Sequence, residues 1–300
     1  MWFFLAILGY SALALTVTLD KFILTKSVGK PIVYTFYSTI FMFGALLLYP
    51  LAPELLSGTE WLWALVSGIT FGLALWAMFV ATKKGEASHI NPFVGAITAI
   101  ATYLTAFFIL GERLSLFDNI GFLVLVIATV LLSFEKTKNN NHIHVGYLYA
   151  FLAGILFAFS HICAKYLYDI NDFLPVFIWT RFTTGFFALF LLFSPAVRRI
   201  FKKRKKKVKS KYRKHALSIV AVTKILGFIG VILIQYAIAI GSVTVVNALA
   251  GFQFVAMFAL IYLMSVFYPK IFKEYFTKKE FWLQLSAIVL VAVGLALFVV

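Results

Sequence analysis

Long apolar runs separated by short polar connections dominate the pattern along this chain. Each run approaches or exceeds the roughly 20 mostly apolar residues that an α-helix needs to cross a bilayer. The runs cover residues 2–19, 32–50, 61–82, 90–110, 117–134, 146–167, 174–194, 215–240, 243–267 and 280–300. Prolines at positions 31, 92 and 175 stand where helices are expected to begin, because proline is tolerated in a first turn. The pattern predicts an all-α polytopic membrane protein with ten transmembrane helices.

Composition supports a membrane protein over a soluble one. The chain is 63% hydrophobic and 13% charged, with a mean hydropathy of +0.98. A soluble domain is usually about half apolar and about a quarter charged. The single cysteine, Cys163, allows no disulfide within the chain.

A polar segment near the middle divides the chain into two halves. Residues 135–145 carry charged residues followed by three asparagines, which is typical of a linker between residues 1–134 and residues 146–300. Short segments of the halves match in order, at a shift that grows from 144 to 162 residues because the second half has longer loops. The matches are Asp20–Leu24 with Ala164–Tyr168, Pro31–Thr35 with Pro175–Trp179, Gly85–Asn91 with Gly241–Asn247, and Glu112 with Glu274.

Five helices in each half have a physical consequence. An odd number forces the second half to enter the membrane in the opposite orientation. Two inverted five-helix repeats are the architecture of many secondary transporters, whose substrate site lies near the midplane between the repeats. The alternative is that duplication only enlarged a helix bundle.

The charge of the chain is strongly positive and unevenly placed. The formal net charge is +16, but twelve of the 27 Lys and Arg residues lie between Arg198 and Lys214. A basic cluster beside a membrane span binds anionic lipid headgroups of the cytoplasmic leaflet. We therefore expect anionic lipids as partners of this loop and no nucleic acid.

The distribution of Lys and Arg predicts the orientation in the cell membrane. Loops after odd-numbered runs carry 23 of these residues, whereas loops after even-numbered runs carry little besides Arg113. Because basic loops stay in the cytoplasm, ten helices place both termini outside. Labelling of the loop from Arg198 to Lys214 from outside intact cells would contradict this orientation.

A motif in the first half adds a family resemblance. Thr82–Phe93, Leu110–Ser115 and Gly121 resemble the EamA-type repeat of the drug/metabolite transporter superfamily. The second copy is degraded, since Ala248 stands where the first copy has a proline, but it keeps Asn247, Glu274 and Gly294. The resemblance implies ten helices, secondary transport of a small metabolite and a central cavity. It also implies cytoplasmic termini, whereas the distribution of Lys and Arg places the termini outside. We favour the orientation that the charges predict.

Charged residues within the spans suggest the kind of solute. None of the eleven acidic residues falls at the centre of a predicted span, which argues against a proton-coupled exporter of cationic drugs. Arg181 and Lys224 do fall within spans, where a cation is functional unless its side chain reaches the interface. With no acid nearby to neutralise them, both predict an anionic or zwitterionic substrate such as an amino acid or phosphorylated compound.

Aromatic rings and amides complete the predicted substrate site. A small-molecule pocket combines apolar walls with a few placed polar groups. The candidates are Arg181, Lys224, Tyr34, Tyr37, Trp76, Asn91, Gln235, Asn247 and Gln253.

Other functions find less support in the sequence. The chain has no phosphate-binding loop and no metal-ligand spacing, so we expect no cofactor and no metal. A flippase for a lipid-linked substrate is the alternative transporter. An intramembrane enzyme is a further alternative, for which Ser160 with His161 is the only candidate pair. The protein is expected to be a monomer or a homodimer.

Overall fold

The computed structural model describes residues 1–23, 30–85, 87–133, 145–202, 212–267 and 278–298, and every regular element in them is a helix. The first half contains α1 (Trp2–Ile23), α2 (Pro31–Ile40), the 3₁₀ segment η2 (Phe41–Leu51), α3 (Glu60–Lys84), α4 (Ala87–Thr105), the π-helical segment η3 (Ala106–Leu110) and α5 (Leu116–Ser133). The second contains α6 (Val145–Tyr168), α7 (Phe173–Leu191), α8 (Pro195–Lys202), α9 (Tyr212–Ile240), α10 (Val243–Ala248), α11 (Ala250–Phe267) and α12 (Lys278–Leu297).

The helices coincide with the apolar runs of the sequence. Within the described ranges, nine helical stretches are long and apolar enough to cross a membrane, and the apolar part of α12, Trp282–Leu297, is shorter. The chain is therefore a polytopic, all-helical membrane protein. Residues 135–144 of the predicted linker and most of the basic segment from Arg198 to Lys214 lie outside the described residues, while Val145 is the first residue of α6.

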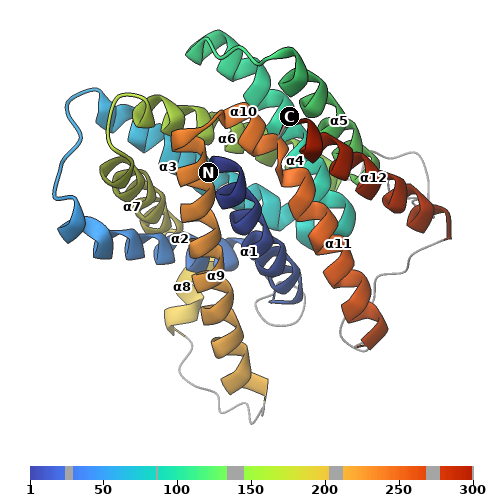
Figure 1. Cartoon of the computed structure of the whole chain (residues 1–300). Coiled ribbons are helices and arrows are strands. Elements are labelled where there is room, and N and C mark those ends of the chain that lie inside the picture. Colours follow the sequence, from blue (N-terminus) through green and yellow to red (C-terminus); the bar gives the residue numbers. More distant parts are fainter. Residues whose placement is uncertain (24–29, 86, 134–144, 203–211, 268–277, 299–300) are drawn as a thin grey trace.

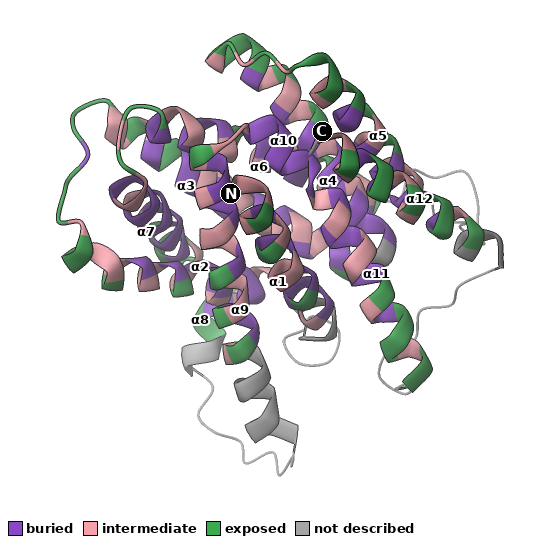
Figure 2. Ribbon diagram, in the orientation of Figure 1, coloured by how far each residue is buried: buried purple, intermediate pink, exposed green. Residues whose placement is uncertain are grey.

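The outer faces of the helices are apolar, as lipid requires. Large hydrophobic side chains such as Phe4, Leu47, Leu62, Phe108 and Trp282 are exposed. Figure 2 shows buried residues concentrated where the helices meet and exposed residues on their outward faces. A soluble protein does not expose so many large apolar groups, since burying them is the main drive for folding.

Helices from the two ends of the chain pack side by side. Figure 1 shows α1 between α9 and α11, and α1 makes extensive contacts with both. In the same way α6 packs against α3 and α4, while α5 packs against α12. The interior is thus shared between the halves instead of forming two separate cores.

Glycines set the closest of these approaches. A Cβ on Gly121 of α5 would lie 3.3 Å from the carbonyl oxygen of Gly294 in α12, and a Cβ on Gly294 would lie 3.3 Å from the carbonyl oxygen of Gly121. Such reciprocal contacts let two membrane helices meet backbone to backbone. The two glycines are those named in the sequence for their resemblance to the EamA-type repeat.

Replacing Gly68 with alanine is expected to destabilise the protein by about 1–3 kcal/mol, the usual cost of overpacking. A Cβ there would lie 2.6 Å from the backbone nitrogen of Thr184 in α7, so the helices must separate. Thermal unfolding in detergent checks the prediction. Gly44→Ala is the matched control, because nothing lies within 4 Å of a Cβ at Gly44. Equal unfolding temperatures for the two variants would contradict it.

Candidate functional site

A cavity of about 190 Å³ lies among helices of both halves. Its wall is formed by α1, α2, η2, α3 and α4 from the first half and by α6, α9, α10 and α11 from the second. Most of the wall is apolar, and its rings come from Tyr10, Phe41, Phe71, Phe79, Phe157, Phe228 and Phe254. A few polar groups interrupt it, which is the composition of a small-molecule site.

Five of the nine residues predicted to bind substrate line this cavity. They are Asn91, Lys224, Gln235, Asn247 and Gln253. Each side chain is buried in the protein although it belongs to a helix that crosses the membrane. The cavity thus collects polar residues from positions as distant in sequence as 91 and 253.

Two other predicted residues lie away from the cavity wall. Tyr37 is half-buried beside the cluster of Val33 and Phe36, and Trp76 packs edge to face on Tyr149 with ring centroids 5.6 Å apart. Both contribute to helix packing in this structure. Their aromatic character alone gave no means of telling a lining residue from a packing residue.

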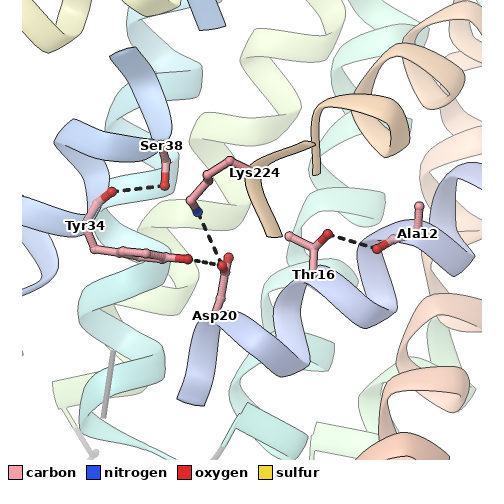
Figure 3. A network of polar contacts seen from close by, with 6 residues as sticks. All are labelled: Ala12, Thr16, Asp20, Tyr34, Ser38 and Lys224. Carbon is pink, nitrogen blue, oxygen red and sulfur yellow. Dashed lines mark hydrogen bonds and ion pairs between the residues drawn. The ribbon is translucent and has the colours of Figure 1, made fainter. Parts of the chain in front are cut away.

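Lys224 and Tyr34 meet at a buried carboxylate that sequence reasoning missed. The Lys224 Nζ lies 3.3 Å from Oδ1 of Asp20, and the Tyr34 hydroxyl donates a hydrogen bond to the same oxygen. The Lys224 Nζ also lies 3.9 Å from the centre of the Tyr34 ring. Figure 3 shows the Asp20 carboxylate between the two side chains, with α1, α2 and α9 each supplying one residue.

This cluster corrects the expectation that no acid within the membrane neutralises Lys224. Asp20 lies at the end of an apolar run, but α1 continues to Ile23 and the Asp20 side chain is buried on the cavity wall. An acidic residue at the boundary of an apolar run was the signal available in the sequence. Lys224 by itself therefore does not require an anionic solute.

A second polar group on the wall joins three helices. The His161 Nδ1 of α6 lies 2.9 Å from the side-chain oxygen of Asn247 in α10. The Asn247 amide nitrogen in turn donates to the Thr102 hydroxyl of α4 at 3.0 Å. Both polar ends of Asn247 are thereby satisfied, and the amide is held in a fixed orientation at the cavity.

Arg181 lies behind this wall and has no hydrogen-bonding partner among the described residues. The side chain is fully buried, and all three of its guanidinium nitrogens are unpaired. The guanidinium carbon is 4.4 Å from the centre of the Phe71 ring and 5.9 Å from that of Phe177. Phe71 also lines the cavity, so the ring that Arg181 contacts belongs to the cavity wall.

The cations within the spans differ in whether an acidic residue neutralises them. Lys165 forms an ion pair of 2.8 Å with Asp169, and Lys224 pairs with Asp20. Arg181 lies over the rings of Phe71 and Phe177, and its guanidinium nitrogens have no hydrogen-bond partner among the described residues. Ring contacts compensate for only part of the desolvation of a guanidinium. An anion that enters this region would find a donor set already in place.

The pair considered for an intramembrane enzyme is engaged in packing. The Ser160 hydroxyl donates to the carbonyl oxygen of Ser67 at 2.8 Å, and the Ser67 hydroxyl donates to the carbonyl oxygen of Ser160 at 2.9 Å. These reciprocal bonds tie α6 to α3, while His161 bonds Asn247. The hydroxyl that a catalytic serine would need is therefore directed at a neighbouring helix.

Comparisons with known proteins give a likeness in fold and no match that names an activity. No protein-family model and no curated protein matches this chain. Among solved structures the chain is similar to one described only as "Crystal structure of protein", with 18% sequence identity and a TM-score of 0.64. The match covers 99% of this chain and 94% of that one. At this identity the likeness concerns the fold alone.

Proposed function

We propose that the chain is a secondary transporter that moves a small metabolite bearing an acidic group, anionic or zwitterionic, by alternating access. The observation that carries the proposal is the buried, unpaired Arg181 beside a cavity between the two halves. A guanidinium binds a carboxylate or a phosphate through two parallel hydrogen bonds. An acidic group on the solute would satisfy nitrogens that no described residue satisfies.

The pattern of helix contacts supports two inverted repeats. In the order of the membrane spans, the corresponding pairs are α1 and α6, α2 and α7, α3 and α9, α4 and α11, and α5 and α12. If the two members of each pair are exchanged, the contact of α3 with α6 becomes that of α9 with α1. Likewise the contact of α4 with α6 becomes that of α11 with α1, and the pairs α2–α7 and α5–α12 map onto themselves. The packing of α3 on α7 lacks an equally extensive counterpart. The exchange fits a pseudo-two-fold axis between the halves.

The family and the placement in the membrane belong to the same proposal. The resemblance of Thr82–Phe93 and Leu110–Ser115 to the EamA-type repeat favours a metabolite transporter of the drug/metabolite superfamily. The charge distribution favours the cell membrane, with basic loops in the cytoplasm and termini outside. Anionic lipid headgroups at the loop from Arg198 to Lys214 follow from the same charges.

Solute exchange by the purified protein in liposomes tests the function directly. Vesicles loaded with unlabelled lactate, succinate, glycerol 3-phosphate, alanine or putrescine are assayed for counterflow of the same labelled solute. We expect counterflow of at least one solute that bears an acidic group and none of the polyamine. Exchange of putrescine alone, or of no solute in the panel, would contradict the proposal. Protein-free vesicles and the exposed-cation variant Arg113→Gln serve as controls.

A further inference from the structure

The ion pair between Asp20 and Lys224 has a place in the fold that solute binding by Arg181 does not explain. It joins α1 to α9, the first membrane span of one half to the third membrane span of the other. Both side chains line the cavity, and both are more than nine-tenths buried. A carboxylate buried among membrane helices is costly and is a common site of proton transfer in transporters.

We propose that Asp20 is the proton-binding group that couples solute transport to a proton gradient, and that its protonation breaks the ion pair with Lys224. The inference rests on the proposed transport function. One proton from water adds to the Asp20 carboxylate and forms the neutral acid, while Lys224 keeps its ammonium charge. The pair then changes from zero net charge to plus one. The Lys224 ammonium, no longer paired with Asp20, can then pair with one negative charge on the solute. A proton on Asp20 and an anionic group of the solute therefore bind together.

The described surroundings of Asp20 offer one cation and one hydroxyl, and no second acidic residue lines the cavity. Of the elements packed around it, α2 presents the Tyr34 hydroxyl and α9 presents Lys224. The titratable His161 of α6 is on the same cavity wall but bonds Asn247. Other lining residues of α4 and α11 are uncharged, such as Asn91 and Gln253. In the described part of the chain no group of three acidic, histidine or cysteine residues is placed to hold a metal ion.

Close helix packing continues from the ion pair along the contact of α1 with α9. Along it, a Cβ on Gly9 of α1 would lie 3.0 Å from the carbonyl oxygen of Gly230 in α9, and Gly227 faces Thr16. Small residues let two helix backbones approach closely, and here the side chains of Ile234 and Leu13 pack on Gly9 and Gly230. Loss of one charged contact at the end of this interface can shift its balance between closed and open arrangements.

Infrared difference spectra of the solute-free protein test the proton site. On acidification the wild type is expected to gain the band of a protonated, buried carboxyl group, and Asp20→Asn is expected to lack that band. Asp169→Asn is the matched control, because Asp169 also pairs with a lysine but is 46% exposed. A buried-carboxyl band that survives in Asp20→Asn, or a wild type without one, would overturn the proposal.

Spin labels test the movement. Cysteines replace the exposed Leu15 of α1 and Ile225 of α9, in a background where the buried Cys163 is changed to alanine. Acidification is expected to add a population with a longer distance between the labels. Asp20→Asn is expected to show that population at every pH. An unchanged distance in the wild type, or an unchanged pH response in the variant, would overturn the proposal. No solute is present in either measurement, so a failure here is distinct from a failure of solute exchange.

Discussion

Replacing Arg181 with methionine is expected to lower exchange of acidic solutes at least about tenfold while leaving the protein at least as stable as the wild type. A hydrogen bond to a charged group contributes about 1.5–3 kcal/mol, and about 1.4 kcal/mol corresponds to a tenfold change in binding. The unpaired guanidinium costs folding energy, so an apolar side chain of similar length removes that cost. Counterflow in liposomes and thermal unfolding in detergent measure the two effects.

The combination of lost transport and retained stability separates a binding role from a structural one. Arg181→Lys keeps a positive charge but loses the planar fork that binds two oxygens, so intermediate transport is expected. Arg113→Gln removes an exposed cation and is expected to change neither quantity. If Arg181→Met unfolds readily and its remaining folded fraction transports normally, Arg181 serves packing on Phe71 and the proposed substrate class is wrong.

Replacing Lys224 with methionine is expected to destabilise the protein by about 3–5 kcal/mol, because it leaves the Asp20 carboxylate buried without its cation. The double variant Asp20→Asn with Lys224→Met is expected to recover most of this loss. In that variant no charge remains unpaired, although Tyr34 can still bond the side chain at position 20. Thermal unfolding of the wild type, both single variants and the double variant gives the coupling energy of the pair.

Lys165 provides a control for the effect of burial, because it also pairs with an aspartate. Lys165→Met removes the partner of Asp169, which is 46% exposed and can be solvated by water or headgroups. Its loss is expected to cost less than about 1 kcal/mol, as for surface ion pairs. Additive effects of the Asp20 and Lys224 substitutions, or equal losses in Lys165→Met and Lys224→Met, would contradict the importance of burial.

The helices of this protein are predictable because their signal is local. A helix that contacts lipid needs a continuous apolar stretch, and such a stretch consists of consecutive residues that can be recognised in the sequence. Irregularities inside the spans were missed. The 3₁₀ segment Phe41–Leu51 and the change of helix at Leu249 leave the apolar pattern unchanged, because they are set by backbone hydrogen bonds and packing.

Asp20 and Arg181 show where prediction from the sequence ended. Asp20 looked like an interfacial residue because the sequence gives depth along a helix but not the direction of a side chain. Arg181 and Lys224 looked alike, since both are cations within apolar runs. Their environments differ because Lys224 meets an aspartate 204 residues away, whereas Arg181 meets two phenylalanine rings.

Hydropathy over some 20 residues decides between lipid and water, so the order of amino acids is enough to place this chain in a membrane as a bundle of apolar helices. The sequence also supplied the polar residues from which a cavity can be built. Which of these residues face one another emerges only from the packing of the helices, because contacts between helices depend on rotation and crossing as well as on composition. That arrangement paired one buried cation, left the other without a partner, and so separated the coupling site we propose from the solute site we propose.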